Sequence, residues 1–269
     1  MTLISFFGLA LPGYALVRLI WPESDWHLGG SISTSIIQPL DLVVAGGFIT
    51  LFVLNWKFMK DKAAEAVLTI PSASSILGGS LGLLLIAAVI PAVLFWRINL
   101  MEFFGLRWDR WKSIFWIMPC FVIAIMLLGG IMFILGWHPW VEATFGSKPQ
   151  HMVQIVQTTP DLALIGTIMF AAIIIAPIAE EVIFRGYLYP VVKRYSERWF
   201  AALFTGLLFG IIHFNLIALP LLVVMGITLV VLYEVTGSLW VTIGCHAAFN
   251  GTSMGLMLLR RFYELPTTP

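Results

Sequence analysis

The stretch Ala176-Pro-Ile-Ala-Glu-Glu-Val-Ile-Phe-Arg-Gly-Tyr187 decides how the rest of the chain is interpreted. It closes an apolar run with two adjacent carboxylates, Glu180 and Glu181, and Arg185 follows. A charged residue at the centre of a membrane-spanning helix costs about 3 kcal/mol on insertion scales, so these side chains need a physical reason. On a helix Glu181 and Arg185 lie one turn apart, in the order that favours an ion pair. Glu180 is rotated by about 100° from Glu181, which leaves its carboxylate free of that arginine.

The composition is that of a membrane protein. Of 269 residues 60% are hydrophobic and 11% charged, and the mean hydropathy is +0.97. A soluble domain carries about 25% charged residues. The net charge of +1, without a basic run, argues against nucleic acid as a partner. Cys120 and Cys245 lie in apolar runs and form neither a disulfide framework nor a CxxC site.

At about 20 apolar residues per crossing, the pattern predicts an all-α polytopic membrane protein of about eight transmembrane helices. The chain is expected to form a single membrane domain, 1–269, with the active site in its C-terminal half and less specific spans over 1–135. Tryptophans recur at the edges of the apolar runs, as in an aromatic belt at headgroup level. The expected spans lie near residues 2–20, 36–56, 76–96, 114–135, 161–180, 199–214, 217–235 and 239–259.

The segment Arg97–Ser113 differs from the spans because it mixes aromatic with basic side chains. It is predicted to lie along the interface. An anchored loop is the favoured interpretation, and a ramp that presents a lipid-borne substrate is the alternative. With eight spans the loops on one side hold nine basic residues and those on the other side six. The positive-inside rule then places both termini outside and the Glu180 end toward the cytoplasm.

Two further motifs carry polar groups on apolar helices. Phe209-Gly-Ile-Ile-His213 and His246-Ala-Ala-Phe-Asn250 each place two such side chains four residues apart, on one helix face. His213 alone would be interpreted as a hydrogen-bonded core histidine, and Asn250 as an interhelical hydrogen-bonding residue. As a set with the two glutamates and the arginine they favour a functional site within the membrane. We expect them to converge on Glu180.

These residue types suit attack of water on a carbonyl. A glutamate serves as general base, a histidine positions the water, and a second histidine with an asparagine donates to an oxyanion. In a metal alternative, Glu180, His213 and His246 bind Zn²⁺, with water in the open position. A proton-coupled transporter is a different class, disfavoured because no internal repeat is visible. A non-catalytic membrane scaffold or immunity factor is the third interpretation.

The motifs Glu180-Glu-Val-Ile-Phe-Arg185, Phe209-Gly-Ile-Ile-His213 and His246-Ala-Ala-Phe-Asn250 resemble the EExxxR, FxxxH and HxxxN signatures of the CPBP family. This family groups type II CAAX prenyl endopeptidases with related prokaryotic intramembrane proteases, including bacteriocin-processing and ABI-type proteins. The flanks agree, and Phe104-Gly-Leu-Arg107 is similar to a weaker family feature. The resemblance covers residues 160–255 and is loose over the N-terminal half.

The resemblance implies an all-helical intramembrane endopeptidase. Glu180 would activate water with help from His213, while His246 and Asn250 would stabilise the oxyanion. Glu181, Arg185 and Phe209 would support the site. The substrate would be a membrane protein or a lipidated peptide in the bilayer, of which a prenylated CAAX protein is one kind. The family has been described both as metalloproteases and as metal-independent glutamate proteases, so the resemblance leaves a bound zinc open.

Overall fold

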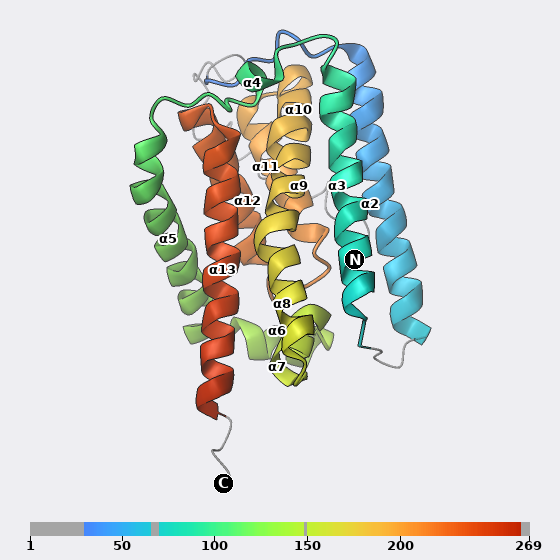
Figure 1. Cartoon of the computed structure of the whole chain (residues 1–269), viewed down its shortest axis with the longest axis vertical. Coiled ribbons are helices and arrows are strands. Elements are labelled where there is room, and N and C mark those ends of the chain that lie inside the picture. Colours follow the sequence, from blue (N-terminus) through green and yellow to red (C-terminus); the bar gives the residue numbers. More distant parts are fainter. Residues whose placement is uncertain (1–29, 66–69, 148–149, 265–269) are drawn as a thin grey trace.

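A computed structural model describes residues 30–65, 70–147 and 150–264, and in these ranges the chain is helical, without strands (Figure 1). The all-α fold predicted from the sequence is therefore confirmed. The helices are α2 (Pro39–Glu65), α3 (Ala73–Leu94), α4 (Leu100–Phe103), η1 (Trp111–Ser113), α5 (Ile114–Ile134), α6 (Trp137–Phe145), α7 (His151–Thr158), α8 (Leu162–Phe170), η2 (Ala171–Ile175), α9 (Ala176–Ile183), η3 (Phe184–Leu188), α10 (Tyr189–Tyr195), α11 (Arg198–Ile211), α12 (Leu219–Thr236) and α13 (Leu239–Glu264).

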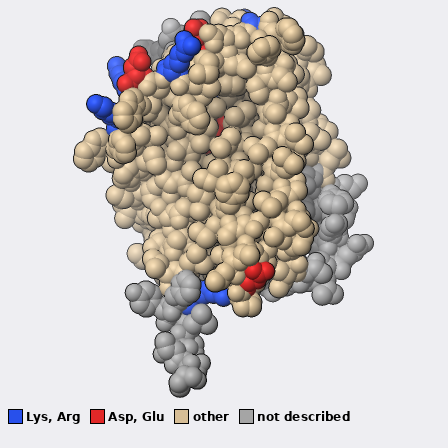
Figure 2. Space-filling model, in the orientation of Figure 1, with Lys and Arg blue, Asp and Glu red and all other residues tan. Residues whose placement is uncertain are grey.

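Four helical segments in the described part of the chain are long and apolar enough to cross a membrane. They are Ala73–Leu94, Trp111–Ile134, Leu162–Tyr195 and Leu219–Thr236, and Pro39–Leu54 and Arg198–Ile211 are shorter apolar helices. The polytopic character is thus supported, while the count of eight spans stays a prediction. The first expected span, 2–20, lies outside the described residues. Figure 2 shows why the bundle fits a bilayer, because charged side chains gather at its two ends and leave a broad uncharged face between them.

The helix that carries both glutamates extends far beyond the predicted end at residue 180. The segments α8, η2, α9, η3 and α10 form one rod, Leu162–Tyr195, so Glu180 and Glu181 lie in its middle. Two π-helical turns, η2 and η3, flank α9 on either side. Turns of this kind change the rotational register of a helix and are frequent at functional sites. The span prediction ended too early because it took the first carboxylates for the membrane boundary.

Helices α11 and α12 form a close hairpin beside this rod. Gly206 and Gly210 of α11 let α12 approach, because a methyl group added at either would lie 2.6 Å from a side chain of α12. A methyl group added at Gly226 of α12 would lie 2.9 Å from the Cα of Gly206. The backbones of the two helices therefore touch without side chains between them, as at other small-residue crossings in membranes.

An ion pair and a hydrogen bond at the carboxylate of Asp41 fasten the N-terminal helices to the rod at the α10 end. The buried carboxylate of Asp41 at the start of α2 accepts two hydrogen bonds from Arg97, at 2.6 and 3.0 Å, and one from the hydroxyl of Tyr187 in η3 at 2.8 Å. The predicted interfacial segment covers the same end of the bundle (Figure 1). Its Phe104 carbonyl accepts from the amide of Leu239, which fixes the segment to the start of α13.

Candidate active site

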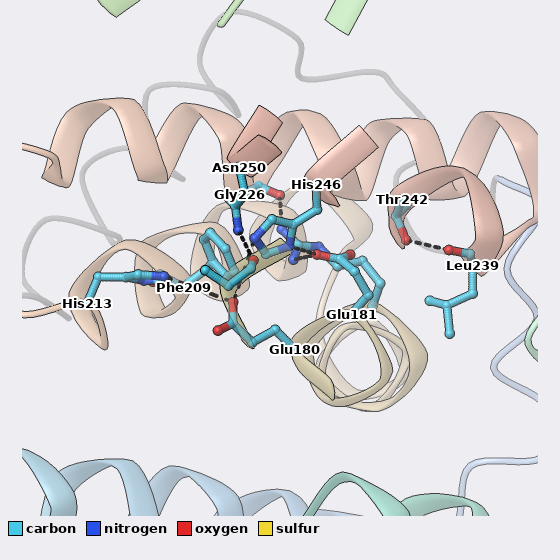
Figure 3. Close-up of polar contacts among 11 residues, drawn as sticks. Glu180, Glu181, Phe209, His213, Gly226, Leu239, Thr242, His246 and Asn250 are labelled. Carbon is cyan, nitrogen blue, oxygen red and sulfur yellow. Dashed lines mark hydrogen bonds and ion pairs between the residues drawn. The ribbon is translucent and has the colours of Figure 1, made fainter. Parts of the chain in front are cut away.

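Three side chains from three separate parts of the bundle converge on one point. Oε2 of Glu180, on α9, lies 4.0 Å from Nε2 of His213 and 3.9 Å from Nε2 of His246, on α13 (Figure 3). The glutamate side chain is 15% exposed and those of His213 and His246 are 21% and 3% exposed, so the point is sheltered but not sealed. The structure thus brings together the acid and the two imidazoles that the sequence placed in different helices.

Glu181 is held by two partners. Its Oε1 accepts from Nη1 of Arg185 at 2.7 Å, the ion pair predicted from the helical spacing, and both side chains are buried. The same oxygen lies 2.9 Å from Nδ1 of His246, a contact that the sequence did not predict. Arg185 also donates from Nη2 to the carbonyl of Gly226 at 2.8 Å, where α12 crosses α11. The carboxylate therefore links the glutamate rod to α13, and the arginine links it to α12.

The ring of Phe209 contacts both histidines and the arginine of the site. Its centroid is 4.9 Å from that of His213 and 5.6 Å from that of His246, and the guanidinium carbon of Arg185 is 4.7 Å from it. The ring is fully buried. It packs against both imidazoles and receives a cation–π contact from the arginine, so one side chain limits the orientations of all three groups.

His213 does not lie within α11, as the predicted span 199–214 had it. The helix ends at Ile211, and His213 follows in the turn before α12. Its Nδ1 still reaches back to the carbonyl of Phe209, at 2.7 Å, so the four-residue spacing operates through a ring-to-backbone hydrogen bond. The imidazole satisfies one of the carbonyls that a helix C-terminus leaves without partners.

Asn250 makes a backbone contact. Its Nδ2 donates to the carbonyl of Ala172 at 2.8 Å, within the π-helical turn η2. The asparagine thus ties α13 to the rod two helical turns before Glu180. One of its two amide hydrogens is used in this bond, and the second is available to another acceptor.

The contacts select one tautomer for each imidazole in its neutral form. A backbone carbonyl and a carboxylate are acceptors, so each neutral imidazole presents Nδ1–H to its partner and keeps the Nε2 lone pair. Both lone pairs face Oε2 of Glu180, a buried atom that accepts no hydrogen bond from any described side chain or amide. These three atoms, the two Nε2 and Oε2, are hydrogen-bond acceptors, so a molecule that donates hydrogen bonds, such as water, can bind between them.

The same three groups include the donor types of a metal site. His213, His246 and Glu180 offer the donor types that zinc takes, and Phe209 and Glu181 bind the opposite ring nitrogens, as partners of metal-bound histidines do. Ligands at about 2.0–2.2 Å around a tetrahedral ion are roughly 3.4 Å apart, closer than these atoms stand. Within the described residues no group of three or more histidine, cysteine or acidic side chains is close enough to hold an ion. The residue types therefore fit a zinc ion, but the distances between their ligand atoms would have to shorten from 3.9 and 4.0 Å.

Sequence comparison finds similarity to membrane peptidases over part of the chain. Residues 162–252 match the sequence model of the family described as Type II CAAX prenyl endopeptidase Rce1-like. The chain is also 28% identical over 158 residues to the Bacillus subtilis (strain 168) protein named "Putative membrane peptidase YdiL". That match covers 58% of this chain and 62% of the other protein. No solved structure matches the chain.

The fold and the site define a helical membrane protein with an intramembrane glutamate–histidine cluster. The matched segment, 162–252, contains the rod from α8 onward and every residue of this cluster. Over this segment the chain is similar to the Type II CAAX prenyl endopeptidase Rce1-like family, in agreement with the CPBP-like motifs of the sequence.

Proposed function

We propose that this protein is an intramembrane endopeptidase that hydrolyses a peptide bond of a membrane-associated substrate with water activated by Glu180. The observation that carries the proposal is the position of Oε2 of Glu180, within 4.0 Å of Nε2 of both His213 and His246. A carboxylate in such a sheltered site, with its acceptor atom aimed at one point, suits a general base. The family match over 162–252 supports the same reaction class.

Each group has a separate part in the proposed reaction. Glu180 removes a proton from water while its oxygen bonds to the substrate carbonyl carbon, and His213 orients that water. The oxyanion receives hydrogen bonds from the amide hydrogen of Asn250 that does not bind Ala172 and from Nε2–H of His246 in its protonated form, whose Nδ1–H stays on Glu181. When the carbon–nitrogen bond breaks, the proton held by Glu180 passes to the leaving amine. Water is consumed, and a carboxylic acid and an amine are formed, or a carboxylate and an ammonium group once the proton has passed between them.

The substrate class and the orientation belong to the same proposal. A site on apolar helices is reached by a membrane protein or a lipidated peptide, and the family description points to prenylated CAAX-type proteins. The proposed orientation, with the α10 end of the rod toward the cytoplasm, is supported by the basic residues in the loops at that end, from which Arg185, buried within the rod, is excluded. A bound zinc ion, held by Glu180, His213 and His246, would supply Lewis acidity to the water. Metal analysis of the purified protein tests this part separately.

The decisive experiment is the substitution Glu180→Gln, which replaces one carboxylate oxygen by an amide nitrogen. Membrane proteomes are compared between cells that carry the wild-type protein and cells that carry Glu180→Gln, and new peptide termini are quantified. A precursor should accumulate with Glu180→Gln, whose shape is unchanged but which cannot take a proton. Glu142→Gln, at an exposed position of α6, is the matched control and should process normally. Normal processing by a folded and inserted Glu180→Gln protein would rule the proposal out.

A further inference from the structure

The turn that carries His213 follows an apolar helix that is too short to cross a membrane. Helix α11 has 14 residues, Arg198–Ile211, so it is about 21 Å long, whereas the hydrocarbon core is about 30 Å thick. The chain then turns over residues 212–218 before α12 begins at Leu219. Irregular backbone within the hydrocarbon core is tolerated only where its polar groups are partnered by protein or line a cavity. The partners of this turn therefore decide whether His213 stays in place.

The turn satisfies only part of its own backbone. The amide of Phe214 donates to the carbonyl of Ile211 at 2.9 Å, and the amide of Ala218 donates to Oδ1 of Asn215 at 2.9 Å. Phe214 has φ 51°, and no other non-glycine residue in the described ranges has a positive φ. Such a conformation is strained for a bulky side chain and persists only where the surroundings hold it.

Two donors from another part of the chain hold the turn at both ends. Nε1 of Trp137, the first residue of α6, donates to the carbonyl of Ile217 at 2.9 Å. Nε2 of Gln150, which precedes α7, donates to the carbonyl of His213 itself at 3.4 Å. Both residues lie outside the segment 162–252 that matches the family.

These donors are themselves anchored. Helices α6 and α7 lie across the lower end of the bundle (Figure 1). Val141 of α6 is buried, and Ile155 and Val156 of α7 pack in a cluster with α8 and with Met254 of α13. Arg261 of α13 donates to the carbonyl of Val156 at 2.6 Å. Gln150 therefore connects the His213 turn, through α7, to α13, the helix that carries His246, and Trp137 connects the turn to α6.

We propose that Trp137 and Gln150 are positioning residues, which hold the turn so that the imidazole of His213 faces Glu180. This inference rests on the proposed hydrolytic function. Because His213 lies beyond the end of α11, no helical hydrogen-bond ladder fixes it. Loss of either donor leaves a carbonyl of the turn without its partner, and the turn relaxes toward other donors. A displacement of about 1 Å is enough to cost on the order of 100-fold in rate.

The test uses the full-length protein with three single substitutions. Trp137→Phe and Gln150→Leu each remove one donor and keep most of the side-chain volume. Trp140→Phe is the matched control, because this ring lies on the same helix, 5.3 Å from that of Trp137, and makes no hydrogen bond to the described turn. The precursor that accumulates in Glu180→Gln membranes serves as the substrate probe. Hydrogen exchange of the amides 211–218 and of α13 is measured in parallel.

We expect Trp137→Phe and Gln150→Leu to lower kcat about 10- to 100-fold with KM unchanged. Exchange of the amides 211–218 should accelerate at least about tenfold, while α13 around His246 and the Trp140→Phe control stay as in the wild type. Unchanged kcat in both variants overturns the inference, and so does a loss that appears only in KM. If Trp137→Phe does not fold, the kcat and the hydrogen exchange of Gln150→Leu alone test the inference. If Glu180→Gln processes normally, the proposed function fails, and the exchange data still report on the turn.

Discussion

Nδ1 of His246 lies 2.9 Å from Oε1 of Glu181, although 65 residues separate them in the chain. This contact gives the second glutamate of the pair a task of its own, since it fixes the ring orientation of an imidazole whose other nitrogen faces Glu180. The two adjacent carboxylates thus act on opposite sides of one ring. The first takes part in the proposed chemistry, and the second aligns the group that assists it.

We predict that Glu181→Gln lowers kcat about 100-fold, because the amide can present its NH₂ group to Nδ1 and leave the ring misaligned. The measurement is turnover of the precursor by folded, purified protein, with KM determined separately. Glu102→Gln, at an exposed position of α4, should have wild-type kcat. A Glu181→Gln enzyme with normal kcat would show that the ring needs no such partner.

Arg185→Met should destabilise the protein by about 3–5 kcal/mol, because it leaves the carboxylate of Glu181 buried without its cation. Removal of both charges in Glu181→Gln/Arg185→Met should recover part of this loss, since no uncompensated charge remains. Melting temperatures in detergent report the effect, with Arg107→Met as the exposed control. Equal melting curves for wild type and Arg185→Met would refute the buried pair as a stabilising contact.

Two glycine substitutions should have effects of opposite sign. Gly226→Ala places a methyl 2.9 Å from the Cα and 3.0 Å from the carbonyl oxygen of Gly206, so α11 must move away from α12 and the protein is destabilised. Gly130→Ala, in α5, meets no atom within 4 Å. It should raise stability by up to about 1 kcal/mol, through helix propensity. The melting temperatures of both variants test this prediction. An unchanged melting temperature for Gly226→Ala would contradict the close approach of α11 and α12.

Arg97→Met should loosen the attachment of the N-terminal helices. It removes two hydrogen bonds from Asp41, which keeps those from Tyr187 and the Gln38 amide, so we expect a loss of about 1–3 kcal/mol. Since Arg97 is itself 21% exposed, the loss should be smaller than that of Arg185→Met. Limited proteolysis between α2 and α3 and thermal melting measure it. A larger loss for Arg97→Met than for Arg185→Met would show that this ranking by burial is wrong.

Part of the site could be predicted from local spacing. The Glu181–Arg185 pair follows from four residues on one helix, and Glu180 was left free of Arg185 by the same rotation. The contact of Glu181 with His246 could not be predicted in this way, because it depends on how α13 packs against the rod. The position of His213 beyond the end of α11 was also missed, since an apolar run does not show where a helix ends inside the membrane.

The sequence by itself determined that the chain is helical and lies in a membrane, and which few polar residues need a reason to be there. Composition and apolar run length suffice for this, because a bilayer admits only helices or closed barrels whose backbone groups are satisfied. The tertiary structure alone decided which polar groups meet. Contacts between helices arise from packing over long sequence separations, such as Glu180 with both histidines and Trp137 with Ile217. No local periodicity encodes them.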